Sequence, residues 1–327
     1  MKLRMLSVTC ALLLTVGACS GEEKKEAEPK DPAKATAAQV AAINPLTGTR
    51  IKQAPDNPVF VVKVDNTRAS APQTNVDRAD MVVEQTVEGG VTRLAALYYS
   101  KLPKTVGHVR SMRATDIGIA KPVRGQVVAS GGAGRTISRI KDAGLTIHSQ
   151  DAGSPGLSRD GGYAPYNVVA DLTRINRDAK QVGPNRPYFQ WAAADAPAPK
   201  GPSVSTASVQ FSRSHTTEWK FDGKVWKRVN GTGTKEFGAK NLVTLWADEK
   251  NAGYTDPAGN PVPETVFAGS GKAVILTGGT RVNATWRKAN PAGTIVLRTA
   301  NGEVFKLPQG KTWIELVNKG AGALSAK

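Results

Sequence analysis

The strongest constraint on the fold is a series of short apolar runs, separated by turn signals, that fills residues 207–319. Most of these runs are rich in β-branched and aromatic residues, which is typical of strands. The pairs Asp222-Gly223, Gly278-Gly279 and Asn301-Gly302 are two-residue hairpin turns of the kind that needs positive φ. The pattern therefore predicts a compact, antiparallel β-rich domain. Its predicted strands are Ser208–Phe211, Thr217–Phe221, Val225–Val229, Leu242–Trp246, Ala273–Thr277, Arg281–Trp286, Thr294–Arg298, Glu303–Leu307 and Thr312–Val317.

Five tryptophans lie in these predicted strands. Their rings could pack in the core or stack against a sugar. We favour core packing because Trp is commonly buried in small β domains. The five are Trp219, Trp226, Trp246, Trp286 and Trp313.

Residues 44–191 have a different pattern, in which strand-like runs alternate with helical ones. Such interleaving predicts layers of helix and sheet. The fold class is therefore α+β, with a layered α/β N-terminal domain followed by a smaller antiparallel β-rich C-terminal domain. The predicted strands are Pro58–Val64, Met81–Val87, Thr92–Ser100, Gly125–Ala129 and Leu145–Ile147, and the predicted helices are Ala114–Ala120, Thr136–Ala143 and Leu172–Val182.

A break in composition separates the two domains. Residues 192–206 (AAADAPAPKGPSVST) repeat Ala and Pro without periodicity, which is typical of a linker. We therefore expect an N-terminal domain over residues 44–191, a C-terminal domain over residues 207–319 and a tail over residues 320–327. The chain has 327 residues, of which 40% are hydrophobic, so it holds enough apolar material for two cores.

Both cysteines of the chain lie in its first 19 residues. Lys2 and Arg4 precede an apolar run from Leu6 to Val16, and small residues stand directly before Cys19. This leader, residues 1–18, resembles a bacterial lipoprotein signal peptide with its lipobox, which implies cleavage before Cys19 and lipidation of that residue. An ordinary signal peptide or an anchor helix is the alternative, and we disfavour it because the apolar run is too short to span a bilayer.

Residues 20–43 are rich in charge, Ala and Pro, which predicts a disordered tether. Residues 19–43 would then comprise the lipidated cysteine and this tether. Several acyl chains make a stable anchor. We therefore expect a protein at the cell membrane, anchored by lipid and facing outside the cytoplasm.

The charge of the chain predicts an anionic partner. The formal net charge is +17, and almost all of the surplus belongs to the body because the leader and tether nearly balance. A positive field of this size attracts anions. Nucleic acid fits the charge but not the compartment, so we expect none. The expected partners are the bacterial membrane through the lipid anchor, an anionic wall or lipid-linked ligand, and an envelope protein.

The sequence gives no sign of a cofactor or a metal. Three histidines, and no cysteine after Cys19, leave too few ligands for a zinc site. The motifs G-x-x-x-x-G-K-[ST], G-x-S-x-G and H-E-x-x-H do not occur. We therefore expect no cofactor and no metal.

The best candidates for a binding site lie near the ends of strands in the N-terminal domain. Asp65 and Asn66 end the first predicted strand, where polar groups often face a ligand crevice, although such a pair is also typical of a turn. Glu84 and Glu88 are evenly spaced, so they share one strand face. Two carboxylates there could do acid–base work, bind a cation or pair with Arg93, and we favour the ion pair.

Two turns add groups that suit an anion. Arg110, Ser111 and Arg113 stand just before a predicted helix, and guanidinium groups bind carboxylate or phosphate with two parallel hydrogen bonds. The stretch Ser130, Gly131 and Gly132 follows the strand that ends at Ala129, and its amides could cradle an oxyanion. These residues complete a predicted anion site.

A set of short segments is spread over nearly all of residues 44–319. They are Asn44–Gly48, Val64–Asn66, Pro72-Gln73, Ala79-Asp80, Glu84, Val87–Arg93, Gly107, Val109–Ser111, Arg113, Ser130–Gly132, Ala164-Pro165, Asn167, Gly269–Ala273, Thr285-Trp286 and Gly310–Trp313. Together they resemble the YerB-like lipoproteins, a bacterial family of two-domain proteins of unknown function. The resemblance implies an exported, membrane-tethered protein with an α/β first domain and a smaller β-rich second domain.

The resemblance names no activity and no catalytic residue. Family members often show His where Ser130 and Tyr166 stand in this chain, so a mechanism that needed those imidazoles is not expected here. Asn167 joins the candidate set through the resemblance. We expect the candidate residues to converge on one crevice: Asp65, Asn66, Glu84, Glu88, Arg93, Arg110, Ser111, Arg113, Ser130, Gly131, Gly132 and Asn167.

Two hypotheses of function follow. We favour a protein without enzymatic activity, whose N-terminal domain binds an anionic envelope component or a partner protein while the lipid holds it at the membrane. The alternative is an enzyme that acts on a cell-wall polymer, with Glu84 or Glu88 as general acid or base and the arginines holding an anionic substrate.

Overall fold

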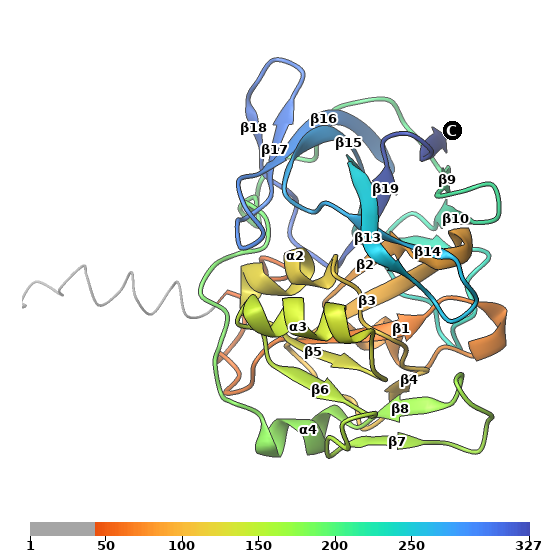
Figure 1. Cartoon of the computed structure of the whole chain (residues 1–327). Coiled ribbons are helices and arrows are strands. Elements are labelled where there is room, and N and C mark those ends of the chain that lie inside the picture. Colours follow the sequence, from red (N-terminus) through yellow and green to blue (C-terminus); the bar gives the residue numbers. More distant parts are fainter. Residues whose placement is uncertain (1–42) are drawn as a thin grey trace, which may run out of the picture.

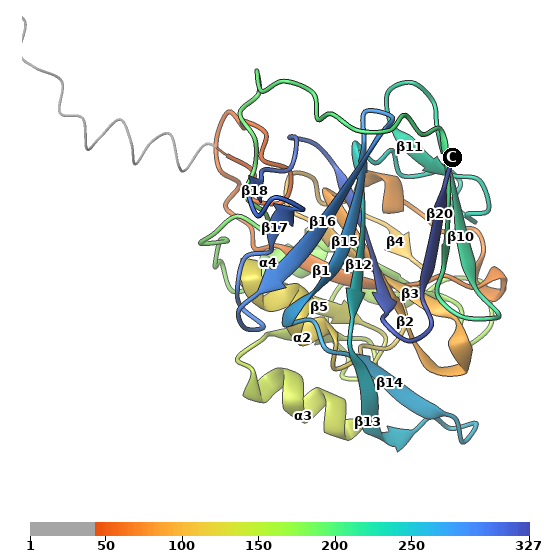
Figure 2. The ribbon, with the colours of Figure 1, turned by 90° about the horizontal axis from the view of Figure 1, so that it is seen from above.

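One mixed sheet of eleven strands runs through the whole of the computed structural model, which describes residues 43–327 (Figures 1 and 2). Most strands pair with neighbours in sequence, but the two halves of the sheet meet at the pair β19–β2. The order across the sheet is β18 (Val304–Phe305), β17 (Val296–Thr299), β16 (Thr280–Lys288), β15 (Gly269–Thr277), β12 (Asn241–Ala247), β19 (Thr312–Asn318), β2 (Met81–Thr86), β3 (Thr92–Tyr98), β1 (Phe60–Asp65), β5 (Gln126–Ala129) and β6 (Ile147–Ser149).

The sheet joins the two expected domains. Strand β19 pairs in parallel with β2, and β12 pairs in parallel with β19. The α+β class and the β-rich C-terminal part are confirmed, but six of the C-terminal strands, β12 and β15 to β19, belong to the same sheet as the N-terminal strands, and that sheet is not wholly antiparallel. The reason is the burial of β2, in which Met81 to Gln85 are all buried. Its backbone groups need a partner on both sides, and β3 and β19 provide them.

The sheet separates two hydrophobic cores. Successive residues of its strands face opposite sides, so Val61 and Val83 pack in one core while Val62 and Val82 pack in the other. The first core is covered by the short helices α2 (Asp116–Ala120) and α3 (Gly134–Asp142), as Figure 1 shows. The second is covered by α4 (Leu172–Asp178) and two small sheets. These are β11 (Trp226–Arg228), β10 (Thr216–Phe221), β9 (Thr206–Gln210) and β20 (Ala323–Ala326), and β4 (Val106–Gly107), β8 (Val168–Ala170) and β7 (Leu157–Arg159).

A hairpin of β13 (Glu249–Thr255) and β14 (Pro261–Thr265) projects from the C-terminal part and packs on α3 (Figure 2). Arg139 of α3 forms two hydrogen bonds to the Glu264 carboxylate, of 2.6 and 2.7 Å. Thr136 and Tyr254 share a hydroxyl hydrogen bond of 2.7 Å. This hairpin was not predicted, because its first strand, EKNAGYT, has no alternating apolar pattern.

Most predicted elements are present with slightly shifted ends. The helix expected to reach Val182 ends at Asp178, and the side chain of Gln181 donates to the backbone carbonyl of Asn176 there. The expected tail contains strand β20, whose Leu324 packs against the second core. Core packing of the tryptophans is confirmed, because none of the five is more than 8% exposed.

Candidate functional site

Six strands end at one edge of the sheet, which we call the carboxyl edge. Strands β12, β19 and β2 pair in parallel, as do β1, β5 and β6. Strand β3 pairs antiparallel with both β2 and β1, so all six strands point the same way. Ligands of layered α/β proteins commonly bind outside such strand ends. Asp65, Glu88 and Ser130 lie directly at or after these ends, and Arg93 lies at the start of β3 on the same edge.

Glu84 lies inside the sheet and has no exposed surface. Its Oε1 atom accepts hydrogen bonds from Thr92 (2.7 Å), Thr217 (2.9 Å) and Asn66 (2.9 Å), and lies 2.9 Å from His215 Nε2. Thr217 and His215 come from the C-terminal half, so this carboxylate ties the two halves together. It is an internal junction and does not face a crevice.

A second buried carboxyl group, that of Glu315, lies beside Glu84 on the neighbouring parallel strand. The indole of Trp219 donates to its Oε1 (2.7 Å). Burial and the adjacent Glu84 carboxylate raise the pKa of Glu315 well above its ordinary value. Burial opposes the ionisation of Glu84 too, but the hydrogen bond and charge of His215 hold the pKa of Glu84 below its ordinary value. The two carboxyl groups therefore carry one proton between them, and this proton resides on Glu315.

Asn66 continues this internal network. Its amide donates to Glu84 and to Thr92 (2.8 Å), and its carbonyl oxygen accepts from Gln73 (2.9 Å) and Arg228 (2.9 Å). All of its hydrogen-bonding capacity is used inside the protein. Asn66 and Glu84 thus belong to the contact between the two halves, whereas the sequence placed them in a ligand crevice.

The arginines at the carboxyl edge form the second group. Glu88 accepts from Arg93 (3.0 Å) and, through both of its oxygens, from Arg113. Burial opposes ionisation of Glu88, but these guanidinium groups lower its pKa to about 2. Burial, together with the nearby charge of Arg113, lowers the pKa of Arg93 to about 10. The ion pair predicted between the two carboxylates and Arg93 is correct for Glu88 only.

Arg110 lies next to this group. Its Nη1 donates to Asp65 (2.8 Å), and its guanidinium stacks on the ring of Tyr166, 4.6 Å from the ring centre. Its Nε and Nη2 have no hydrogen-bond partner among residues 43–327. Asp65 also accepts from the backbone and hydroxyl of Thr67, both at 2.6 Å. Asp65 therefore stabilises a turn through Thr67, and it also lies at the carboxyl edge, so both predictions for this residue are correct.

Three other predicted positions contribute mainly backbone atoms. The carbonyl of Ser111 accepts from Arg93 (3.3 Å). The amide of Ser130 donates to the carbonyl of Arg110 (3.1 Å), and the carbonyl of Gly131 accepts from the amide of Met112 (2.9 Å). The loop of Ser130, Gly131 and Gly132 therefore packs against the arginine-bearing segment, and the amide of Ser130 is not available to an oxyanion.

Asn167 lies outside the group. Its amide donates to the carbonyl of Gly162 (2.6 Å), and its carbonyl oxygen accepts from Arg159 (2.7 Å). These contacts stabilise the connection between β7 and β8. The expected single crevice is thus divided into an internal junction, a largely buried cluster of arginines at the carboxyl edge and the separate loop that holds Asn167.

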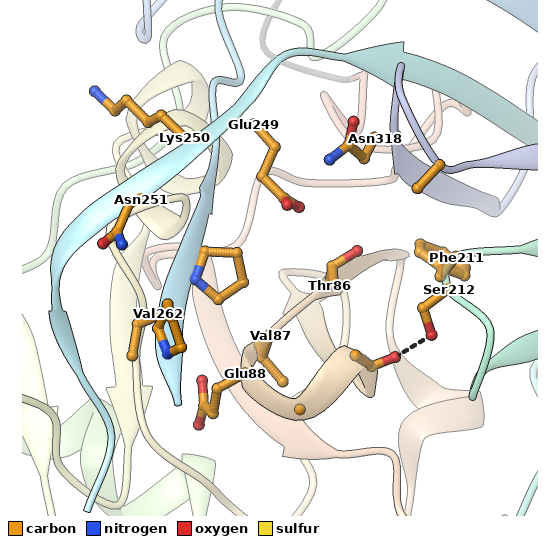
Figure 3. Close-up of a pocket in the computed structure, with 15 residues that line it drawn as sticks. Thr86, Val87, Glu88, Phe211, Ser212, Glu249, Lys250, Asn251, Val262 and Asn318 are labelled. Atoms are coloured by element: carbon orange, nitrogen blue, oxygen red, sulfur yellow. Dashed lines mark hydrogen bonds between the residues drawn. The ribbon is translucent and has the colours of Figure 1, made fainter. Parts of the chain in front are cut away.

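A cavity of about 490 Å³ opens at the carboxyl edge beside Glu88 (Figure 3). The ends of β2 and β19, the hairpin β13–β14 and the turn between β9 and β10 enclose it. Glu249 points its carboxyl group into this space, and burial raises the pKa of Glu249 above its ordinary value. The sequence analysis missed Glu249 because it lies on the unpredicted hairpin. The lining is Thr86, Val87, Glu88, Gly89, Gly90, Phe211, Ser212, Glu249, Lys250, Asn251, Pro261, Val262, Pro263, Asn318 and Ala321.

No group of three or more His, Cys, Asp or Glu within residues 43–327 is arranged to hold a metal ion. No helix of that part of the chain is long and apolar enough to cross a membrane. The leader, Cys19 and the tether lie outside the described residues.

Fold and site together define a two-part α+β protein, built on one mixed sheet, with paired charges and a cavity at the carboxyl edge. Residues 46–185 match the profile of the DUF3048 N-terminal domain, and residues 207–314 match the profile of the DUF3048 C-terminal domain. Both profiles are described as a protein of unknown function. The chain therefore belongs to this two-domain family, the YerB-like family.

Two further comparisons agree. The chain is 26% identical over 310 residues to "Putative lipoprotein YerB" of Bacillus subtilis (strain 168), which covers 88% of this chain and 89% of that protein. It also resembles the crystal structure of the YerB protein from Bacillus subtilis, with a TM-score of 0.71 and 22% identity over 86% of this chain and 99% of that one. This second likeness shows the shared fold.

Proposed function

We propose that this chain is a lipid-anchored, extracytoplasmic binding protein that holds an anionic envelope component at the carboxyl edge. The leader with Cys19 supports the anchor, and the similar Bacillus subtilis protein is named a lipoprotein. A protein partner that presents a carboxylate or phosphate would use the same chemistry.

The observation that carries the anion proposal is the state of Arg110. Arg93 and Arg113 are held by Glu88, but Arg110 uses one of its five N–H donors on Asp65. Three guanidinium groups stand against two carboxylates here, which leaves one positive charge in excess. The stack on Tyr166 holds the guanidinium plane in place, so that little entropy is lost when an anion pairs with it.

The enzymatic alternative is less well supported. Glu84 has no exposed surface, so it cannot reach a polymer. Glu88 is bound by two arginines and has a pKa of about 2, which makes it a weak base. The acid–base roles suggested by the sequence therefore do not suit the positions of these residues.

The test is a binding screen of the full-length protein in a neutral detergent. Wall fragments, anionic sugars and phosphorylated lipids are added, and the shift in melting temperature is recorded; a ligand at 100 times its Kd adds about 2.7 kcal/mol. We expect a stabilising anion whose effect is lost in Arg110→Ala but kept in Arg287→Ala, a change at an exposed arginine of β16. A hit that survives Arg110→Ala would refute the proposed site.

A further inference from the structure

We propose a second, separate anion site at the opposite edge of the sheet, which takes a phosphate group. A cavity of about 570 Å³ lies where β2 and β19 begin and β3 ends, and we call it the amino-edge cavity. Its cationic lining residues are Arg78, Lys101, Lys235 and Lys311. They come from four different segments of the chain and from both halves of the molecule.

Three carboxylates, those of Asp77, Asp80 and Glu236, also line this cavity, and each is engaged by a donor of the protein. Asp80 accepts from the side chain of Asn44 (3.1 Å) and from the backbone amides of Tyr99 (2.7 Å) and Ser100 (2.9 Å). Glu236 accepts from Arg228 (2.8 Å), which does not line the cavity. Asp77 forms an ion pair of 3.8 Å with Arg78. The lysines of the cavity form no ion pair with a carboxylate of residues 43–327, so their charge remains for a ligand.

Lys311 is the central residue of the site. Its ammonium donates to the backbone carbonyl of Asp77 (2.7 Å) and forms no ion pair with any carboxylate of residues 43–327. It lies 5.2 Å from the ring centre of Phe237. Burial lowers the pKa of Lys311; the nearby carboxylates of Asp80 and Asp77 oppose this shift, and the charges of Lys101 and Arg78 add to it. A partly buried ammonium beside two further cations is stabilised when an anion enters among them.

Sequence segments that the carboxyl-edge site leaves unexplained meet at this cavity. Thr47 belongs to Asn44–Gly48, Asp80 to the pair Ala79-Asp80, and Lys311 to Gly310–Trp313. The amide of Gly310 donates to the carbonyl of Thr47 (2.8 Å), which holds two of these segments together. The wall of the cavity is thus fixed by backbone contacts.

The chemistry of the lining selects phosphate. Ammonium groups bind phosphate as point charges from several directions, and a phosphate monoester carries about −1.5 to −2 charge with three acceptor oxygens. Thr47 and Thr49, whose hydroxyl groups share a hydrogen bond of 2.8 Å, also line the cavity. Its volume matches a small molecule, so the phosphate would be part of a headgroup-sized ligand. A lipid headgroup and a soluble phosphate ester share this chemistry.

Calorimetric titration of the full-length protein in a neutral detergent tests the proposal. The probes are glycerol 3-phosphate, dihexanoyl-phosphatidylglycerol below its micelle concentration, and glycerol as the uncharged control. We expect saturable binding of at least one phosphate probe and none of glycerol. Binding of glycerol 3-phosphate would indicate a soluble ester, and binding of the lipid alone would indicate a lipid headgroup.

Three variants locate the binding. Lys311→Met should weaken it by about tenfold or more, the loss expected for a charged hydrogen bond. The double variant Lys101→Ala with Arg78→Ala changes exposed residues, so it reports on binding even if Lys311→Met does not fold. Lys141→Ala, an exposed lysine of α3, is the matched control and should bind as the parent protein does.

Two outcomes would overturn the proposal: no saturable binding of either phosphate probe, or binding that the double variant leaves unchanged. Loss of binding in Arg110→Ala with retention in the double variant would assign the phosphate to the carboxyl edge instead. Each of the two proposed sites can therefore be refuted without refuting the other.

Discussion

The cationic side chains at the two edges of the sheet have different partners. At the carboxyl edge Arg93 and Arg113 are held by Glu88, and Arg110 is held by Asp65. At the amino edge Lys311 has only a carbonyl partner, while Lys101 and Lys235 are exposed. The first arrangement resembles a structural ion-pair network with one donor group left over, and the second resembles an open anion site.

This difference shows that a charge surplus read from sequence does not locate a ligand. The most prominent arginines of the sequence are largely neutralised by their neighbours. Of the lysines with available charge, Lys311 stood out only as part of the segment Gly310–Trp313, and Lys101 and Lys235 did not stand out, because isolated surface lysines carry no pattern. Loss of a paired charge at the carboxyl edge should therefore cost stability, whereas loss of Arg110 or of a cation at the amino edge should cost binding.

The largest effect is expected for Glu88→Ala. The change leaves two partly buried guanidinium groups without their shared carboxylate, so the free energy of unfolding should fall by about 3 kcal/mol. Urea denaturation measures it. Glu303→Ala, at an exposed glutamate, is the control and should change little. A loss below about 1 kcal/mol would mean that the network is not structural.

The next effect concerns a wall of the amino-edge cavity. Gly48 has φ +71°, and a Cβ atom there would lie 2.5 Å from the ring of Trp191. Gly48→Ala should therefore cost about 2 kcal/mol through backbone strain and the steric clash. Thermal unfolding measures it. Gly223→Ala also has positive φ but open space, so it separates strain from clash.

The buried carboxyl pair between the edges should make stability depend on pH. The folded chain keeps a proton on Glu315 that the unfolded chain releases above its ordinary pKa of 4.5. The free energy of unfolding should therefore fall as the pH rises from about 4.5 toward the pKa of Glu315 in the folded protein, by up to about 1.4 kcal/mol per pH unit. Glu84 has a lowered pKa, so its own contribution is lost only at lower pH.

Glu315→Gln tests this dependence because glutamine mimics the protonated group. Urea unfolding at about pH 5, 7 and 9 should give a flatter profile for the variant than for the parent chain. The same slope in both proteins would show that Glu315 does not hold the proton.

The smallest effect is expected at the amino edge. Lys101→Ala and Arg78→Ala remove exposed cations, so each should change the free energy of unfolding by about 0.5 kcal/mol or less. Denaturation curves of the two single variants measure this. A cost comparable to that of Glu88→Ala would remove the contrast between the two edges.

Much of the local structure was predictable. The β-branched residues of Met81–Val87 and the turn Gly278-Gly279 indicated strand β2 and the hairpin β15–β16, because both signals lie within a few residues. Part of the site was also predictable, since Glu88, Arg93 and Arg113 do meet. The hairpin with Glu249 was not, because its strands are largely polar and are stabilised by contacts with α3.

The sequence by itself determined the local elements, the burial of the tryptophans and the family, because periodicity, turn residues and short motifs are local properties of the chain. Only the tertiary structure decided which strands meet and which charges are neutralised. The pairing of Glu315 with Glu84 joins residues more than two hundred positions apart. Such contacts depend on the packing of the whole sheet, and no local pattern records them.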